Sequence, residues 1–286
     1  MTLFHQITYF LLSLLKKWTS FLSPKTRWRF ANRLASIIYR YIPVRQNQAR
    51  KNIGRAFPQW SSAKIEETIK NAYRFFTYNF VQFLSFPKSW EGVKISVTGK
   101  ELIDESLKQK RGIIMISAHF GAWELFVKSL GDHGHFCVGV ANRQRNLGSD
   151  RFFQEQRELC GVKHIFKEER IDKMYEVLSR NGILGLVSDQ DAKKKGVFVN
   201  FFGIPASTHR GAALFHEKAN SPMIFGVCIQ TGFQQYQVEF QPVIPKSQTV
   251  KDITQAYTSI LEKIVRQYPE QYFWFHRRWK TKPISE

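Results

Sequence analysis

The chain has 286 residues, of which 43% are hydrophobic, and its 43 Lys and Arg against 23 Asp and Glu give a formal net charge of +20. This length and hydrophobic content suit one large α/β domain or two small ones with a full-sized core. The three cysteines form no C-x-x-C pair, which argues against a disulfide framework and predicts no bound metal. A positive field attracts nucleic acid, an anionic membrane or an acidic carrier protein, and charge alone does not choose among them.

The N-terminus favours a membrane surface. Residues 3–15 are largely apolar and are followed by Lys16, Lys17 and Trp18. This stretch is shorter than the roughly 20 apolar residues of a membrane span, and it lacks the flanks of a cleaved signal peptide. Lys and Trp beside an apolar helix are typical of an interfacial anchor. We therefore predict a membrane anchor at residues 1–22, with a helix packed on the core as the alternative.

Residues 23–90 are predicted to be a helical region that associates with the membrane. Residues 24–41 have the pattern of a basic amphipathic helix, in which Arg27, Arg29 and Arg33 alternate with apolar residues. A short helix before Pro58 and a long helix from Ser61 toward residue 84 follow.

After residue 90 the pattern predicts an α/β core at residues 91–286, a mixed sheet flanked by helices. Six β-rich runs are expected, at 94–98, 112–117, 135–141, 182–188, 222–229 and 236–243. Helices are expected between them, at 100–110, 121–133, 148–160, 170–180, 208–219 and 250–267. The run 112–117 is apolar almost throughout, which indicates a buried central strand whose following loop is a place for function.

That loop contains His119, and Glu124 lies five residues later with Gly121 between them. If Glu124 lies in the first turn of the next helix, its carboxylate can reach the imidazole, and Gly121 permits the tight approach. A neutral imidazole can take a proton from a hydroxyl that attacks a thioester, while a carboxylate on the other ring nitrogen fixes the tautomer. G-x-S-x-G, G-x-G-x-x-G, phosphate-loop and H-E-x-x-H motifs are absent, which disfavours serine hydrolase, nucleotide and zinc chemistry.

The block at residues 116–124 resembles the catalytic block of the lysophospholipid acyltransferase superfamily, and more closely that of the lipid A biosynthesis lauroyl/myristoyl acyltransferases. Further blocks match that group in order, at 50–58, 141–143, 188–191, 196–206, 208–211 and 272–280. The resemblance extends from about residue 27 to residue 283.

The resemblance implies transfer of an acyl group from acyl carrier protein, or acyl-CoA, to a hydroxyl of a lipid A precursor. The place would be the cytoplasmic face of a bacterial inner membrane, with peripheral or single N-terminal attachment. His119 and Glu124 carry over as the catalytic pair, and Arg143 and Asp189 as residues that organise the site. No cofactor is implied beyond the acyl donor as co-substrate.

Physical reasoning gives these other residues specific roles. Arg143 at a strand end can bind a phosphate or the carrier's phosphopantetheine arm, and an ordinary surface arginine is the alternative. Asp189 can orient a basic residue or cap a turn. Arg210, near the start of a helix, can help to hold a lipid phosphate. A basic cluster near the C-terminus is either a lipid or carrier contact or a solvated charge run, and consists of His276, Arg277 and Arg278.

Three other functions remain open from the sequence. Related enzymes acylate other glycolipids or lysophospholipids, and water in place of the acceptor would give a thioesterase. From another class, a basic nucleic-acid-binding protein fits the charge and the mixture of basic and aromatic residues, but no nucleic-acid-binding module is present, so we expect no nucleic-acid partner.

Overall fold

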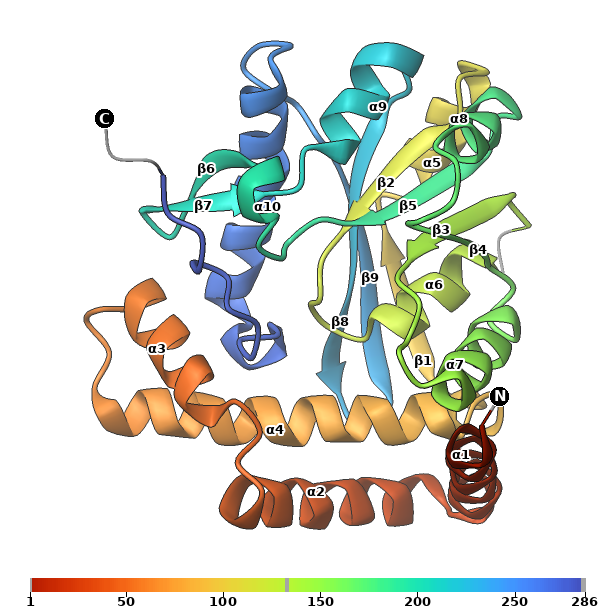
Figure 1. Cartoon of the computed structure of the whole chain (residues 1–286), viewed down its shortest axis with the longest axis vertical. Coiled ribbons are helices and arrows are strands. Elements are labelled where there is room, and N and C mark those ends of the chain that lie inside the picture. The colour runs from red at the N-terminus through yellow and green to blue at the C-terminus, as the bar shows by residue number, and fades with distance from the viewer. Residues whose placement is uncertain (1, 132–133, 284–286) are drawn as a thin grey trace.

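The computed structural model describes residues 2–131 and 134–283 (Figure 1). Four helices come first: α1 (Leu3–Phe21), α2 (Pro24–Tyr41), α3 (Gln46–Ala56) and α4 (Ser62–Leu84). Two of their starts follow from capping, because the hydroxyl oxygens of Ser23 and Ser61 accept hydrogen bonds from backbone N–H groups in the first turns of α2 and α4. The prediction that this part of the chain is helical is confirmed.

Seven strands form the main sheet in the order β1-β9-β8-β2-β5-β3-β4. Their bounds are β1 (Lys94–Thr98), β2 (Ile113–Ser117), β3 (Cys137–Ala141), β4 (Lys163–Phe166), β5 (Ile183–Val187), β8 (Met223–Gly232) and β9 (Gln235–Pro242). All neighbouring pairs are parallel except β8 with β9, so the sheet is mixed, as predicted. Strands β6 (Val197–Phe201) and β7 (Ile204–Thr208) form a separate antiparallel hairpin.

Helices cover both faces of the sheet. Their bounds are α5 (Glu101–Lys108), α6 (Trp123–Gly131), α7 (Leu147–Glu158), α8 (Asp172–Ser179), α9 (Gly211–Ala219) and α10 (Val250–Gln267). Buried side chains of α8, α9 and α10 share one hydrophobic cluster with β2 and β5, while those of α5 and α6 share another with the same strands. Strand β2 is buried along its whole length, which confirms the predicted central strand.

The sequence missed some elements and misplaced some ends. Strands β4, β6 and β7 were not predicted, and all three are short. The helix predicted at 121–133 begins at Trp123, and residues 132 and 133 lie outside the described residues. Arg27 was expected on the polar face of α2, but its side chain is buried.

The N-terminal helices form a layer at one end of the sheet (Figure 1). Helix α2 lies alongside α4, and α1 packs against α7. The close approach of α1 requires a glycine at position 148, because a Cβ there would lie 1.9 Å from the carbonyl oxygen of His5. No helix in the described part of the chain has both the length and the apolar character needed to cross a membrane.

Candidate active site

His119 lies in the loop that follows β2, and the neighbouring backbone fixes this loop tightly. The backbone N–H of Ala122 donates to the carbonyl of Cys228 on β8, at 2.8 Å, and the carbonyl of His119 accepts from the N–H of Phe273, at 3.0 Å. Gly121 has a φ of +63°, and a Cβ there would lie 2.0 Å from the Cys228 carbonyl oxygen. A glycine is therefore required here, although the close approach it permits is to β8.

Asp189, which follows β5, is the carboxylate that holds the His119 ring. One of its oxygens, Oδ1, lies 2.8 Å from Nδ1 of His119 and also accepts the backbone N–H of His119 at 3.0 Å. The Asp189 side chain is 3% exposed and that of His119 is 33% exposed. The carboxylate is thus enclosed, while part of the ring stays accessible, and an N–H on Nδ1 would donate to Asp189 and leave Nε2 free to accept a proton.

Buried Arg278, from the C-terminal segment, lies near the His119–Asp189 pair. Arg278 donates from Nη1 to the carbonyl of Ser207 at 2.7 Å and from Nη2 to Oγ1 of Thr208 at 2.5 Å. Burial alone would raise the pKa of Asp189, but the charge and hydrogen bonds of His119, together with the Arg278 charge, lower it below the ordinary value. Asp189 therefore carries a stable negative charge behind the imidazole.

Glu124 lies in the first turn of α6, as predicted, and lines the same pocket as His119. No hydrogen bond between Glu124 and His119 occurs among the described residues, so the predicted contact of this carboxylate with the imidazole is not formed. Nδ1 of His119 is held by Asp189 instead. Burial raises the pKa of Glu124 to about 7, against smaller opposing effects that include the charges of Arg157 and His119. The interaction between Glu124 and His119 is thus one of charge, without a hydrogen bond.

The pKa of His119 reflects both carboxylates. Burial lowers it, but the charge and hydrogen bond of Asp189, with a contribution from the Glu124 charge, raise it above the ordinary value. An imidazole with a raised pKa is a stronger base, and its protonated form is stabilised by the same carboxylates. The arrangement can accept a proton at Nε2 and return it.

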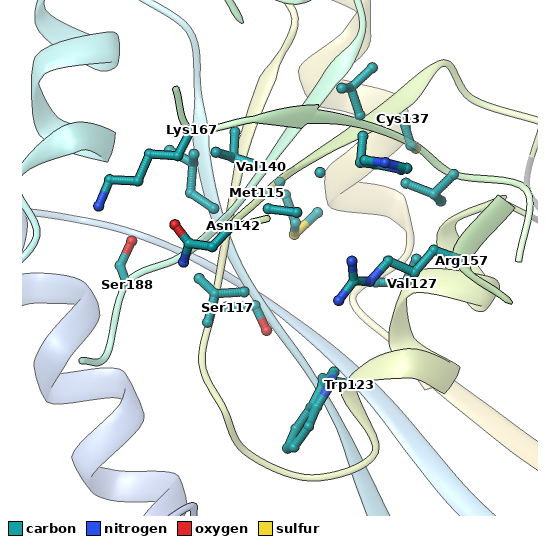
Figure 2. A pocket seen from close by; sticks show the side chains of 18 of the residues that line it. Met115, Ser117, Trp123, Val127, Cys137, Val140, Asn142, Arg157, Lys167 and Ser188 are labelled. Atoms are coloured by element: carbon teal, nitrogen blue, oxygen red, sulfur yellow. The ribbon is translucent and has the colours of Figure 1, made fainter. Parts of the chain in front are cut away.

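A pocket with a volume of about 570 Å³ opens beside His119 at the carboxyl ends of β2, β5 and β3. This volume is within the usual range for ligand sites. Apolar side chains line one part of it, including Met115, Val127, Leu130, Cys137 and Val162. Figure 2 shows Val127 and Cys137 on the right of the view, together with Arg157, and Lys167 and Ser188 on the left, so the apolar part of the lining also holds a charged group.

The predicted basic residues lie outside the pocket lining. Arg143 follows β3 but is exposed; its guanidinium lies 3.8 Å from the centre of the Phe166 ring and 3.9 Å from Oδ2 of Asp150. Arg210 is exposed at the N-cap of α9, which confirms the predicted helix start. Their phosphate-binding roles stay predictions.

The C-terminal basic cluster divides into residues with different environments. Arg277 is exposed and His276 is partly exposed, so contact with lipid or carrier stays a prediction for both. Arg278 is 2% exposed and bonded to β7, which makes the predicted surface contact wrong for this residue. Nothing in a run of basic residues indicates which one is buried, so this difference could not be predicted from the sequence.

Sequence reasoning also missed several residues that line the pocket. Gln190 places its amide nitrogen 3.4 Å from Nε2 of His119. Arg157 extends from the end of α7 into the pocket from the side opposite Lys167, and Asn142 follows β3 (Figure 2). The positions of Asn142 and Gln190 just after predicted strands were the available signal. In the described part of the chain, no group of three or more His, Cys, Asp or Glu is placed to hold a metal ion.

The fold and site together define an α/β enzyme with a histidine–carboxylate pair beside a partly apolar pocket. The family model for bacterial lipid A biosynthesis acyltransferases matches residues 2–281, so the chain belongs to that family and is an acyl-transferring enzyme. It is 24% identical to the lipid A biosynthesis palmitoleoyltransferase of Escherichia coli (strain K12), over 98% of this chain and 93% of the relative. The lauroyltransferase of the same organism is also 24% identical, over 90% and 86%. A lipid A biosynthesis acyltransferase of Haemophilus influenzae is 26% identical over 82% and 77%.

Proposed function

We propose that this enzyme transfers a fatty acyl chain from acyl carrier protein, or acyl-CoA, to a hydroxyl of a lipid A precursor. Membership in the lipid A acyltransferase family supports the acceptor class. The observation that carries the chemistry is His119 beside the pocket, with its Nδ1 held by buried Asp189 and its Nε2 left to act as a base. The donor is proposed from the resemblance of residues 116–124 to the lipid A acyltransferases, and a histidine base is suited to attack on its thioester.

In the proposed reaction, Nε2 of His119 takes the proton from the acceptor hydroxyl as its oxygen attacks the thioester carbonyl. A carbon–oxygen bond forms, the carbon–sulfur bond then breaks, and the imidazolium returns its proton to the leaving thiolate. Throughout, Nδ1–H stays bonded to Asp189, whose charge stabilises the imidazolium. The amide of Gln190, 3.4 Å from Nε2, lies where the acceptor hydroxyl would bind and would move aside.

Glu124 remains in the proposed catalytic pair but with a changed role. Its ionised form adds a second negative charge near the imidazolium, which lowers the cost of forming that cation in a buried site. Because burial places the pKa of Glu124 at about 7, this contribution grows as the pH rises through neutrality.

The apolar side of the pocket is the proposed binding place for the acyl chain. The apolar residues of this part of the lining come from β2, α6, β3 and the segment before β4, and they are Met115, Val127, Leu130, Cys137 and Val162. Burying each methylene of the chain there contributes about 0.8 kcal/mol, so a long chain binds mainly through this part.

We propose that α1 and α2 bind the surface of the inner membrane on its cytoplasmic face. Large apolar side chains on α1 are exposed, including Leu3, Phe4, Phe10, Leu11 and Leu14. The exposed basic side chains nearby are suited to anionic headgroups and include Lys17, Lys25, Arg29 and Arg33. A helix of this kind lies in the interface with its apolar face among the lipid chains.

The activity is tested with purified enzyme, radiolabelled acyl carrier protein or acyl-CoA donors, and a lipid A precursor in mixed micelles. Wild-type enzyme is expected to add one acyl chain, and His119→Ala is expected to lose roughly a hundred- to ten-thousandfold in kcat. Lysophospholipid and other glycolipid acceptors are assayed in parallel, and free fatty acid is measured to detect thioester hydrolysis. Near-normal transfer by a folded His119→Ala enzyme would refute the mechanism, and preferred acylation of another acceptor would refute the lipid A assignment.

Membrane binding is tested by flotation with vesicles that contain anionic phospholipid. Leu11→Glu together with Leu14→Glu places two charges on the exposed face of α1 and is expected to leave most of the protein unbound, as is removal of residues 1–22. Ser259→Glu, at an exposed position of α10, is the control and is expected to bind as the wild type does. Equal flotation of all four proteins would show that α1 is not the binding surface.

A further inference from the structure

Three polar side chains lie side by side where adjacent strands of the sheet end. Ser188 follows β5, Asn142 follows β3 and Lys167 follows β4. Asn142 and Lys167 are each one residue past the last β3–β4 pair, and Asn142 and Ser188 are each three residues past the last β3–β5 pair. Equal counts beyond the paired residues assign all three positions to one level. Side chains at one level of a parallel sheet point to the same face, and neighbouring strands are about 4.8 Å apart.

Backbone hydrogen bonds continue past the strand ends, from β4 to β3 and from β5 to β2, and the first of these supports the alignment of Lys167 with Asn142. The N–H of Lys167 donates to the carbonyl of Ala141, at 2.9 Å, and the N–H of Ser188 donates to the carbonyl of Ser117, at 3.1 Å. All three side chains line the pocket beside His119, and Figure 2 shows them toward its left side. Together they supply an ammonium, an amide and a hydroxyl to one part of the pocket.

The charge of Lys167 is available to a ligand. No ion pair among the described residues includes Lys167, and its positive charge acts on His209, another pocket residue, whose pKa burial and this charge both lower. Glu169 is the nearby acidic residue of the lining, but its Oε2 is paired with Lys173 at 2.6 Å and its Oε1 accepts the backbone N–H of Phe166 at 2.8 Å. This side of the pocket therefore keeps a net positive charge.

Arg143, the residue that the sequence favoured for an anion, is differently placed. Its guanidinium lies over the Phe166 ring and near Asp150, and its side chain does not line the pocket. One strand farther along the sheet, Lys167 lines the pocket. The cation that faces the ligand space is thus Lys167.

We propose that Lys167, Asn142 and Ser188 form a subsite for a phosphate ester group of one of the two substrates. A phosphate offers several acceptor oxygens and negative charge, which match the exposed Lys167 ammonium, the exposed Asn142 amide and the buried Ser188 hydroxyl. Strand spacing places Asn142 two strands and Lys167 three strands from β2, which is about 10 to 14 Å from the strand that leads to His119. A phosphate held by these three residues would orient, relative to His119, the substrate that carries it.

This subsite rests on the proposed acyl transfer, and two phosphate sources share the chemistry: the donor's phosphopantetheine arm and the acceptor lipid. Lys167→Met removes the charge and keeps most of the side-chain length. Lys251→Met, at an exposed position of α10, is the matched control. Each variant is assayed with the phosphopantetheine thioester, with the same acyl group on a thiol without phosphate, and with phosphorylated and dephosphorylated acceptor.

Lys167→Met is expected to raise KM at least about tenfold for one phosphorylated substrate and to change kcat less than about twofold, because one charged hydrogen bond contributes about 1.5–3 kcal/mol. The effect disappears when that substrate lacks its phosphate, which identifies the source. An unchanged KM for both substrates, or an equal rise for the phosphate-free versions, would overturn the subsite.

Binding of inorganic phosphate provides a readout that does not need activity. Calorimetry at low ionic strength is expected to detect weak binding to wild type and to Lys251→Met, and none to Lys167→Met or to Asn142→Leu. Retained phosphate binding without any acyl transfer would refute the proposed function and keep the subsite. Acyl transfer by the wild type, with equal phosphate binding in all variants, would refute the subsite and keep the proposed function.

Discussion

Two carboxylates act on the His119 imidazole, and they lie in regions that differ in how well they stabilise a negative charge. Asp189, after β5, accepts two hydrogen bonds from His119 and lies near the Arg278 charge, so its pKa is lowered despite burial. Glu124, in the first turn of α6, is desolvated without a comparable partner, so burial raises its pKa to about 7. The pKa of the first carboxyl is thus held below its ordinary value, whereas that of the second is raised to about 7.

The difference separates two tasks that the sequence assigned to one residue. A carboxylate that fixes a tautomer must be bonded to Nδ1 and must stay charged, and Asp189 satisfies both conditions. A carboxylate that only stabilises the imidazolium needs no hydrogen bond, and its contribution depends on pH. The comparison predicts that the two residues differ in the size and in the sign of their mutational effects.

The largest effect is expected for Asp189→Asn. Asn removes the negative charge behind the imidazolium, and an amide that turns its nitrogen toward Nδ1 also leaves the proton on Nε2 and removes the base that faces the substrate. We expect kcat to fall about a hundred- to ten-thousandfold with a nearly native fold. The residual activity is expected to have its acid limb at lower pH than the wild type, because the charge that raises the pKa of His119 is gone.

Steady-state kinetics at saturating donor, from pH 5 to 9, check this prediction. Circular dichroism and the unfolding midpoint serve as controls for the fold, because Asp189 is buried. A kcat within threefold of wild type would mean that Glu124, or another group, orients the ring.

The fold was largely predictable because its strong signals are local. The buried strand β2, with five consecutive buried residues, and the helices that begin at Ser23 and Ser61 caps follow from patterns within a few residues. The strands that were missed, β4, β6 and β7, are four or five residues long, and their pairing depends on partners supplied by the sheet or the hairpin. A short strand has little pattern of its own.

The site was predictable only in part, for the same reason. His119 and Glu124 are five residues apart, so one segment contains both. The carboxylate that accepts the hydrogen bonds of His119 is Asp189, 70 residues away. The sequence did suggest Asp189 as a residue that orients a basic group, but not which group. Lys167 and Asn142 become neighbours through strand order, and burial of Arg278 depends on its contacts with β7. These are properties of the packed sheet.

The smaller effect is expected for Glu124→Gln, and its sign differs between activity and stability. Activity should fall about ten- to a hundredfold at pH 8, where Glu124 is ionised and stabilises the imidazolium, and the ratio to wild type should approach one below pH 6. As a control, Arg157→Gln removes a charge that opposes the rise in the Glu124 pKa. It should therefore move the Glu124-dependent part of the profile to higher pH. A deficit for Glu124→Gln that is equal at pH 6 and pH 8 would contradict an electrostatic role.

Stability should change in the opposite direction, because a folded-state pKa above the ordinary value of 4.5 means that folding favours the protonated form of Glu124. That preference is fully present below pH 4.5 and is lost as the pH rises through about 7, so ionised Glu124 destabilises the fold at pH 8. Glu124→Gln should raise the free energy of unfolding at pH 8, by on the order of 2 kcal/mol, and should change it little at pH 5. Asp189→Asn should lower it at both pH values, because the Asp189 pKa is lowered in the fold. Urea unfolding of the three proteins at the two pH values measures both signs, and a Glu124→Gln enzyme less stable than wild type at pH 8 would show that this carboxylate is as well bonded as Asp189.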